Sequence, residues 1–339
     1  MKTINNFFAV ILLALITVAC NEELEIKSAT GEDMKFSQGE IALPDATGST
    51  VEAYYLGQRV ELEFINGQYI LHGDMIVPES QISFVAPPAG VATESVGRTG
   101  GRWANNTVYY QISSNLTNTQ RVTDAIAHWE ANTALRFVQR TNQSDYIFFQ
   151  PGGGCSSYIG RVGGRQVINL ASGCSTGNTI HEIGHAVGLY HEQSRADRDN
   201  FVNILFQNIE AGKENNFRTY VQSGSDGDEY TSTLDFGSIM MYGPTFFSKN
   251  GQPTIQKVDG SSYSIQRNGL SAGDKAGIAI MYPDNGNGGG GQQYVNGQYY
   301  TIDGLRVYRY NNLWYWYGNG RDGTGWYQVE NRNGSWYYA

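Results

Sequence analysis

The sequence has few charged residues and no block of like charge. Asp, Glu, Lys and Arg make up only 16% of its 339 residues, and the acidic residues outnumber the basic ones to give a net charge of −9. Phosphate binding needs a basic face, so this composition argues against nucleic acid as a partner. The low charge, together with 42 glycines and 23 tyrosines, is typical of an exported, loop-rich globular protein rather than a cytosolic helical one.

Long apolar runs are absent after the N-terminus, where Lys2 precedes a single run from Phe7 to Ala19. This run is long enough for the hydrophobic part of a signal peptide and short for a helix that spans a membrane. No later segment has the length and apolarity to cross a bilayer. We therefore interpret residues 1–20 as an export signal that is removed, and we expect a secreted protein or one held at the cell surface.

The end of the signal leaves two kinds of processing open. Residues 17–20, Thr-Val-Ala-Cys, resemble the cleavage box of bacterial lipoproteins, in which Cys20 would carry a lipid anchor at the bacterial cell surface. Thr17 stands where that box usually has Leu. The alternative is ordinary cleavage by signal peptidase near Ala19, which follows the small-residue rule for such sites and releases the protein.

Cysteine is scarce, with three residues in the whole chain. Because Cys20 is lost with the signal or lipidated, Cys155 and Cys174 remain, and an even pair in an oxidising compartment predicts a disulfide. Two free thiols are the alternative. An unpaired exposed thiol is a liability outside the cell, which favours the disulfide.

Composition divides the chain into five segments. The residues after the signal are polar and acidic, with weak strand patterns and no visible chemistry, and the breaker cluster Pro87–Gly90 indicates a flexible joint near their end. Beyond a Gly/Asn-rich stretch that reads as a flexible linker, four of the six Trp residues lie between Gly-containing turns, which predicts a small β unit. The segments are a signal peptide (1–20), a precursor segment (21–93), a central domain (94–283), a linker (284–293) and an aromatic, β-rich C-terminal module (294–339).

Within the central domain, short strand patterns precede helical ones, which predicts an α+β fold. Val122, Ile126 and Trp129 recur at helical spacing, and Asn118 or Thr119 is available to cap the start of that helix. We expect strands at 108–112, 146–149, 156–161 and 167–170, and helices at 119–134 and 178–188.

Three of the five histidines lie within eleven residues, at the spacing H-E-x-x-H-x-x-x-x-x-H. His181 and His185 are four residues apart, so on a helix they project from one face at a separation that a single zinc ion can bridge. Gly188 permits the turn, through a positive φ, that ends the helix and brings His191 round as third ligand. Glu182 can reach the water on the metal without occupying a ligand position. The motif predicts one catalytic zinc ion per chain; histidines in ordinary packing are the bland alternative.

The motif and the residues that follow it, 191–199, resemble the extended zinc signature of the astacins, a family of metzincin zinc endopeptidases with bacterial members. The resemblance extends from about residue 102 to residue 283. It implies a metzincin catalytic domain over residues 94–283, with the active-site helix between two subdomains, that hydrolyses protein or peptide substrates.

A second stretch, Ser-Ile-Met-Met-Tyr at 238–242, is similar to the Met-turn of the same family. The resemblance implies that Met240 forms an apolar floor beneath the metal and that Tyr242 is a switchable metal ligand. Met241 replaces the His that usually precedes this Tyr. In the implied reaction Glu182 takes a proton from the attacking water and gives it to the leaving amine, while Tyr242 moves to hydrogen-bond the oxyanion.

The resemblance also implies where the substrate binds. Residues Cys155, Ser156, Ser157 and Tyr158 resemble the edge strand on which astacins hold substrate backbone, and Cys174 stands where the disulfide partner of Cys155 is expected. Arg267, in a stretch similar to the start of the family's late helix, is expected to shape the pocket for the residue after the scissile bond and to favour Asp or Glu there. A surface salt bridge is the alternative for Arg267. The family's second disulfide is absent.

The precursor segment carries a candidate for latency. Leu71-His72-Gly73-Asp74 resembles the Phe-x-Gly-Asp element of astacin propeptides, in which the Asp coordinates zinc and displaces the catalytic water. A plain turn at Gly73-Asp74 is the alternative. The resemblance implies that residues 21–93 are a propeptide cut near Glu94, or after Arg98 by a trypsin-like enzyme, and that the new N-terminus is buried near Glu192.

Three other interpretations compete with this one. Exposed Trp and Tyr side chains stack on sugar rings, so the C-terminal module is a candidate for contact with a polysaccharide or cell wall; aromatic rings in so small a unit also serve as its core. An inactive binding protein on the same fold is not favoured, because the three His residues and Glu182 are all present. A different metal-dependent hydrolase is disfavoured by the Met-turn.

Overall fold

The structure is a computed structural model that describes residues 40–55, 58–86, 101–225, 227–283, 298–302, 305–310, 313–320, 323–332 and 335–338. Several predicted features lie outside these residues: the signal peptide with Cys20, the cut positions Glu94 and Arg98, and the linker 284–293. Across the described ranges, no helix has both the length and the apolar character needed to span a membrane.

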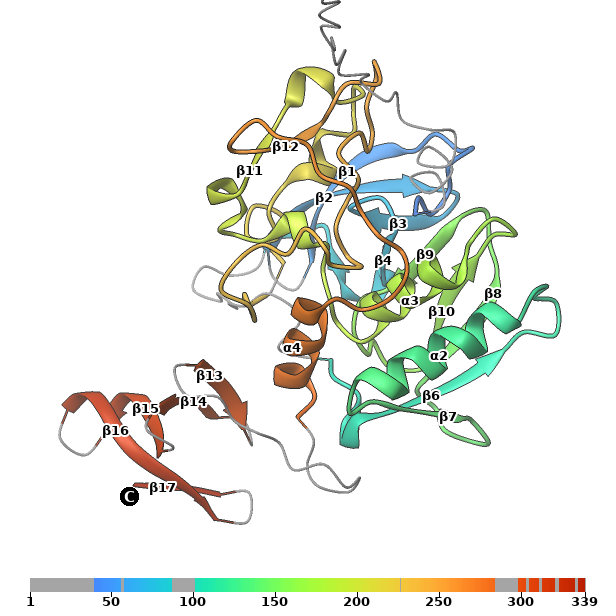
Figure 1. Cartoon of the computed structure of the whole chain (residues 1–339). Helices are drawn as coiled ribbons and strands as arrows, with labels where there is room; N and C mark the ends of the chain where they lie inside the picture. Colours follow the sequence, from blue (N-terminus) through green and yellow to red (C-terminus); the bar gives the residue numbers. More distant parts are fainter. Residues whose placement is uncertain are drawn as a thin grey trace, which may run out of the picture.

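A ten-stranded mixed sheet runs through the larger part of the molecule (Figure 1), with strand order β5-β1-β2-β3-β4-β9-β10-β8-β6-β7. Strands β6, β8 and β10 are parallel neighbours, whereas β9 runs antiparallel to β10. The strands are β1 (Ser49–Tyr55), β2 (Gln58–Ile65), β3 (Gln68–Leu71), β4 (Met75–Val77), β5 (Ile82–Ser83), β6 (Thr107–Ile112), β7 (Arg136–Gln139), β8 (Tyr146–Pro151), β9 (Cys155–Tyr158) and β10 (Arg165–Leu170).

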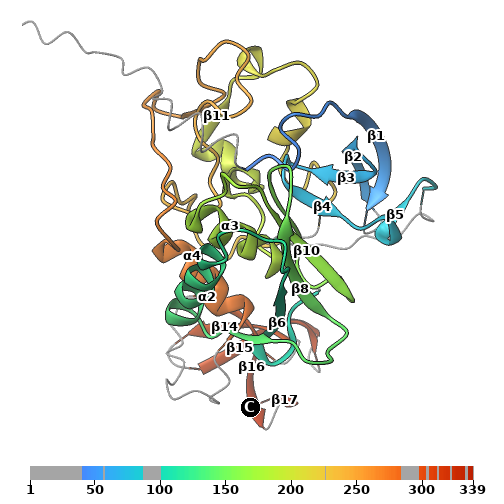
Figure 2. The same ribbon diagram turned by 90° about the vertical axis from the view of Figure 1, so that its right-hand side faces the viewer.

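Two helices, α2 (Gln120–Asn132) and α3 (Thr176–Ala186), lie on one face of this sheet, as Figure 2 shows. The apolar side chains of α2 enter the same core as Ile147 and Phe149 of β8. Trp129 also donates from Nε1 to the backbone oxygen of Ile180 at 3.1 Å, which fastens α2 to α3. The expected α+β arrangement of strands and helices is present. Thr119 occupies the cap position of α2, but its side chain makes no capping hydrogen bond.

The chain after α3 forms a second region built mainly of loops, and α3 runs between it and the sheet (Figure 1). Its core gathers Phe217, Met241, Tyr242 and Phe246. The regular elements there are β11 (Val202–Ile204), β12 (Ile255–Lys257) and α4 (Ala272–Met281), with the short 3-10 helices η3 (Glu192–Ser194), η4 (Arg198–Asn200), η5 (Phe206–Asn208) and η6 (Glu214–Phe217); η1 (Glu79–Gln81) and η2 (Ala104–Asn106) precede them.

Residues 40–86, called the N-terminal segment below, complete the sheet on one side. Strand β4 pairs in parallel with β9, with Met75 opposite Ser157 and Ile76 opposite Tyr158. The Ser157 N–H donates to the backbone oxygen of Asp74 at 3.1 Å. Strand β9 was expected at the edge of the sheet; in this chain it is an interior strand, because the N-terminal segment covers its free side.

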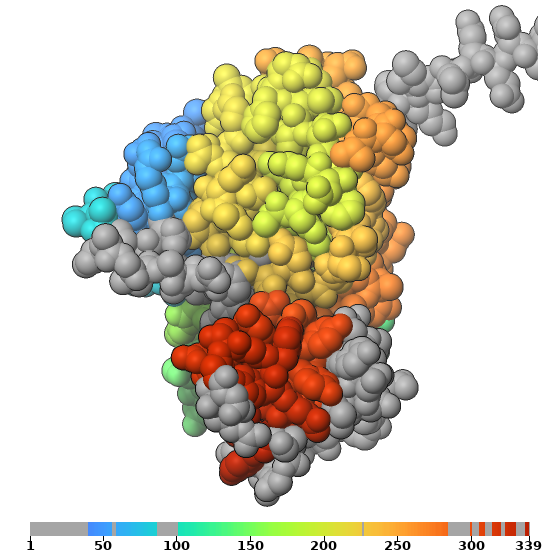
Figure 3. All heavy atoms as spheres, turned by 90° about the vertical axis from the view of Figure 1, so that its left-hand side faces the viewer, coloured from blue at the N-terminus to red at the C-terminus, as the bar shows by residue number. Residues whose placement is uncertain are grey.

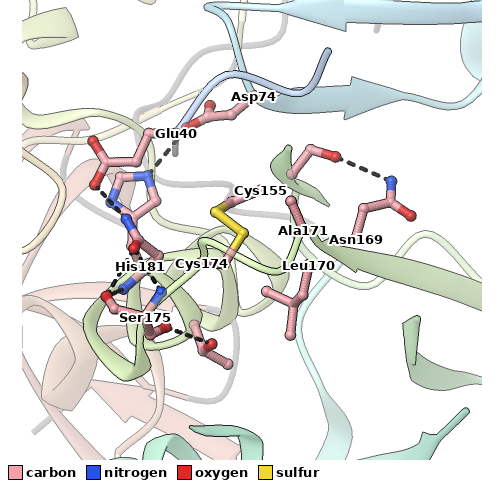
Figure 4. Close-up of a disulfide and its surroundings, with 12 residues drawn as sticks. Glu40, Asp74, Cys155, Asn169, Leu170, Ala171, Cys174, Ser175 and His181 are labelled. Carbon is pink, nitrogen blue, oxygen red and sulfur yellow. Dashed lines mark hydrogen bonds and ion pairs between the residues drawn. A yellow bond between two sulfur atoms is a disulfide. The ribbon is translucent and has the colours of Figure 1, made fainter. Parts of the chain in front are cut away.

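The predicted disulfide joins Cys155 to Cys174, whose Cα atoms are 6.1 Å apart. It ties β9 to the loop just before α3, and Figure 4 shows it beside the residues of the candidate site. Both cysteines are buried. The disulfide therefore fixes the distance between the strand and the helix that flank the site.

The described parts of the C-terminal module form a five-stranded antiparallel sheet. Figure 3 shows the atoms of this module in red, below the second region of the molecule. One face carries Val307, Val329 and Trp316 and packs against Ile280 of α4. On the other face Tyr317 and Trp326, whose ring centroids are 5.3 Å apart, are 56% and 49% exposed. The strands are β13 (Gln298–Ile302), β14 (Leu305–Tyr310), β15 (Leu313–Gly320), β16 (Gly323–Arg332) and β17 (Ser335–Tyr338).

Candidate active site

Helix α3 presents the first two histidines of the motif. Ser175 starts the helix with a capping box: its Oγ accepts from the Asn178 backbone N–H at 3.1 Å, and its own N–H donates to the Asn178 side chain at 2.9 Å. This cap makes the helix begin two residues before the predicted start. His181 and His185 then project on one side, with ring centroids 4.7 Å apart, and both are buried.

The turn after α3 brings the third histidine to the other two. The helix ends at Ala186, whose backbone oxygen accepts from Trp103 Nε1 at 2.9 Å. Gly188 has a φ of 108°, so the predicted positive φ is confirmed; a side chain there would be strained. The ring of His191 consequently lies 4.7 Å from that of His185 and 5.3 Å from that of His181, between centroids.

Asp74 of the N-terminal segment lies at the centre of these histidines. Its Oδ2 is 3.2 Å from Nε2 of both His181 and His191, and its Oδ1 is 3.4 Å from Nε2 of His185. One ligand atom from each of the four residues falls within 4.8 Å of all the others. The side chains come from two distant parts of the chain, as Figure 4 shows for Asp74 and His181.

The donor atoms of this group fit one zinc ion. His181 and His185 donate from Nδ1 to the backbone oxygens of Ile239 and Leu189, each at 2.8 Å, so their Nε2 lone pairs face the centre. Burial lowers the pKa of His191 to about 3, which keeps that imidazole neutral as a ligand must be. Three imidazole nitrogens and one carboxylate oxygen form a donor set typical of tetrahedral zinc.

Glu182 stands next to the first of these histidines and is fully buried. Neither of its carboxylate oxygens has a hydrogen-bond partner among the residues that the structure describes. Burial, and after it the charge of Asp74, raises the pKa of Glu182 well above its ordinary value. A buried carboxylate without partners is costly for stability, which points to a chemical role for Glu182.

The predicted Met-turn passes beneath α3. Met240 is buried, and its Sδ lies so close to Gly184 that a Cβ on that glycine would come within 2.7 Å of it. A larger residue at position 184 would therefore require the Met240 side chain to shift away from the helix. The turn itself is fixed by Asp274, which accepts from Ser238 Oγ at 2.6 Å and from the Ile239 N–H at 2.9 Å.

Tyr242 directs its hydroxyl to the N-terminal segment. Its Oη donates to the backbone oxygen of His72 at 2.6 Å. Its ring lies 4.4 Å from that of His191, between centroids. The predicted role as a switchable metal ligand stays a prediction, and the contact with His72 adds a partner that the sequence did not indicate.

The residues expected to bind substrate are all close to the N-terminal segment. Cys155, Ser156, Ser157 and Tyr158 form β9, which pairs with β4. Arg267 makes a two-point ion pair with Glu40, from Nε to Oε1 and from Nη2 to Oε2, the second at 2.6 Å. The side chains of Arg267 and Glu40 are 4% and 1% exposed, so the alternative of a surface salt bridge is wrong: the pair is buried.

Glu192 lies outside the histidine cluster, at a small cavity of about 60 Å³. Its Oε1 accepts from the Asp235 N–H at 2.8 Å, and burial raises its pKa to about 7. The other acidic residues that line the cavity are Asp228, Glu229, Asp235 and Asp274, and the basic ones are His191 and Arg195, whose Nη1 lies 3.7 Å from Glu192 Oε1. The cavity is thus suited to a positively charged group.

Sequence reasoning missed four residues that shape this site, namely Glu40, His72, Asn178 and the supporting role of Asp274. Asp274 forms a capping box with Ser271 at the start of α4. That box is a sequence signal for the helix start but not for the contact with the Met-turn. Nothing local in the sequence marks Glu40 or His72 as partners of residues 138 to 227 positions away.

Comparison of the sequence with known protein families and proteins shows which of them this chain resembles. The model of the family described as Astacin, a family of peptidases, matches residues 95–283, more than half of the chain. Zinc metalloproteinase nas-13 of Caenorhabditis elegans is 40% identical over 197 residues, which are 57% of this chain and 43% of nas-13. Flavastacin of Elizabethkingia meningoseptica is 38% identical over 196 residues, which are 53% of this chain and 42% of flavastacin.

Among solved structures, High choriolytic enzyme 1, a hatching enzyme zinc-protease from the medaka fish Oryzias latipes, is 31% identical with a TM-score of 0.49, and the match covers 58% of this chain and 98% of that one. The regions of nas-13 and flavastacin that this chain matches make up less than half of the length of each protein.

Proposed function

Since the chain belongs to the astacin family of peptidases, we propose that it is a zinc-dependent endopeptidase, made as a latent precursor and exported. The observation that carries the proposal is the convergence of three buried imidazole Nε2 atoms within 4.8 Å, beside a buried Glu182 whose oxygens have no partner among the described residues. Catalytic zinc sites use three protein ligands and keep a fourth position for water or substrate.

The proposed reaction divides the work between the metal and Glu182. Zinc held by His181, His185 and His191 would supply Lewis-acid chemistry, which lowers the pKa of water and polarises a peptide carbonyl. Glu182 takes the proton that the water loses and delivers it to the leaving amine. Burial raises the pKa of Glu182, so the carboxyl group can hold a proton between these two steps.

Tyr242 is proposed to stabilise the oxyanion of the transition state. Burial raises the pKa of its hydroxyl well above the ordinary value, so the group remains a hydrogen-bond donor. In the precursor that donor is occupied by the backbone oxygen of His72. Removal of the propeptide would free the hydroxyl for the substrate.

Latency is proposed to reside in Asp74. Its carboxylate takes the position, facing all three imidazoles, where a fourth ligand would stand. The propeptide of residues 21–93 would be removed by a cut near Glu94 or after Arg98. The new ammonium group would then enter the acidic cavity at Glu192, where a buried carboxylate with a raised pKa gains most from an opposite charge.

Export is proposed from the apolar run 7–19 and from the disulfide. The run has the length of a signal peptide, and a structural disulfide such as Cys155–Cys174 persists in oxidising compartments. The mature enzyme would be secreted or, with a lipid on Cys20, held at the bacterial cell surface.

Metal removal tests the proposed activity. The processed protein is expected to cleave a denatured protein substrate, to lose at least about 99% of that activity when zinc is removed by a chelator, and to regain it on zinc addition. Metal content by atomic absorption and cleavage by gel electrophoresis give the result. Cleavage that survives complete loss of metal would refute the assignment.

The same digestion reports the proposed preference for acidic residues. Arg267 binds the Glu40 carboxylate at two points in a buried pocket, and a substrate Asp or Glu offers the same group. Mass spectrometry of the products should therefore show Asp or Glu directly after most cut bonds. Products without that enrichment would remove Arg267 from the substrate pocket.

The C-terminal module is proposed to contact polysaccharide. The face of its sheet opposite α4 exposes Tyr299, Tyr317 and Trp326. The ring centroids of Tyr299 and Trp326 are 6.1 Å apart. Sugar rings stack on exposed aromatic side chains of this kind. The full chain should sediment with insoluble cell-wall polysaccharide, and Trp326→Ala should reduce the bound fraction about tenfold. Equal binding of both proteins would leave these rings a purely structural role.

A further inference from the structure

The ion pair between Glu40 and Arg267 is the most deeply buried one that joins the N-terminal segment to the rest of the described chain outside the metal group. Both side chains are almost completely covered, and the guanidinium meets the carboxylate along two N–H directions. Removing one partner of such a pair leaves a buried charge without compensation, which is strongly destabilising. The N-terminal segment is therefore held by this contact as well as by Asp74.

The pair contacts two segments that also carry residues of the candidate site. Arg267 Nη2 also donates to the backbone oxygen of Met241 at 3.0 Å, the residue before Tyr242. Asn178, one helical turn before His181, donates from Nδ2 to Glu40 Oε1 at 3.3 Å. Figure 4 shows Glu40 on the same side of the disulfide as His181. The Glu40 carboxylate thus contacts helix α3 one turn before His181, the first histidine of the cluster.

The backbone that carries Glu40 is in tight contact with the loop before β9. A Cβ on Gly154 would come within 1.8 Å of the backbone oxygen of Ile41. The Ala42 N–H donates to the backbone oxygen of Gly73 at 2.9 Å, next to Asp74. The segment that holds Glu40 is therefore coupled directly to the turn that holds the metal-facing carboxylate.

We propose that Glu40 acts as an internal stand-in for an acidic substrate side chain: it fills the pocket formed by Arg267 and Asn178 and is a second latency anchor, separate from Asp74. This inference rests on the proposed function, in which Arg267 reads the residue after the scissile bond. Asn178 becomes a second residue that reads the carboxylate. Two contacts then maintain latency: Asp74 occupies the metal position, and Glu40 occupies the pocket of Arg267 and Asn178.

The other ion pairs of the N-terminal segment do not have this character. Lys213 pairs with Glu63 at 2.8 Å and Arg218 with Glu61 at 3.0 Å, and all four side chains are partly exposed. Glu52 pairs with Arg59 within the segment itself and is 61% exposed. Glu52→Gln is therefore a matched control, since it removes the same charge from the same segment without touching Arg267 or Asn178.

The test compares full-length Glu40→Gln, Glu40→Asp and Glu52→Gln with the wild type by two measurements. Hydrogen exchange at the Ala42 amide should be at least about tenfold faster in Glu40→Gln, because a lost buried partner loosens the segment. Peptide hydrolysis by the unprocessed chain should rise by about tenfold as well. Glu40→Asp, which keeps the carboxylate on a shorter side chain, should fall between, and Glu52→Gln should match the wild type.

Further arms keep the inference separable from the proposed function. After removal of the propeptide, Glu40→Gln and wild type have identical sequences, so equal kcat/KM shows that the variant folded. In the full chain, Arg267→Gln should speed hydrogen exchange at the Ala42 amide as much as Glu40→Gln does. The variant that combines both substitutions should exchange no faster than either single variant. Additive effects, or Ala42 exchange in Glu40→Gln equal to that in Glu52→Gln, would overturn the second anchor. A processed wild type without peptidase activity would overturn the proposed function alone, since the exchange measurement still decides the anchor.

Discussion

Replacing Glu182 with Gln is expected to lower kcat of the processed enzyme by about 10²- to 10⁴-fold, the range for loss of a general base. The amide keeps the shape of the side chain but cannot take the proton from water. The three imidazoles are untouched, so zinc content should equal that of the wild type. Stopped assays on a peptide substrate, with zinc measured on the same sample, give both numbers.

Glu210→Gln is a suitable control, because Glu210 is exposed on the second region of the molecule and the substitution removes the same charge. It should leave kcat unchanged. A Glu182→Gln enzyme with full turnover would show that another group serves as the base. Loss of zinc along with activity would instead assign Glu182 to metal retention.

Replacing Asp74 with Ala should make the unprocessed chain active. The carboxylate faces all three imidazoles, and without it a water molecule can take its place. If the propeptide keeps the competent state near 1% of the chains, its release raises hydrolysis by up to about 100-fold. Peptide cleavage by the purified full chain, with gel analysis to show that it is still uncut, measures the effect.

Asp45→Ala is the control for this variant, because Asp45 is an exposed carboxylate of the same segment. It should leave the chain latent. An Asp74→Ala chain that stays as inactive as the wild type would remove Asp74 from the latency mechanism. Latency would then rest on the pairing of β4 with β9 and on the ion pair of Glu40 with Arg267.

The local parts of the site could be predicted because short-range geometry determines them. A spacing of four on a helix places His181 beside His185, and a glycine three residues after the second His allows the reversal to His191. The structure starts α3 two residues before the predicted position because Ser175, a residue of the type that caps helices, stands just ahead of it. Asp74 was reached by resemblance to a short family element and not by any pattern of its own.

The rest of the site depends on pairings between distant segments. The parallel register of β4 on β9 sets where Asp74 lies, and no turn or alternation in either strand specifies that register. Glu40 and Arg267 are 227 residues apart, and each alone resembles an ordinary charged surface residue. The contact of Tyr242 with His72 follows from the same docking. Such pairs become visible only once the segments are assembled.

The proposed removal of residues 40–86 would also uncover strand β9, which now pairs with β4. The N–H groups that β9 now shares with the N-terminal segment would be left open, and an open row of this kind accepts another extended chain. A substrate polypeptide would then pair with β9 in the position that β4 occupies in the full chain. In the full chain, β4 occupies this edge of β9, so two copies of the protein cannot associate by pairing there.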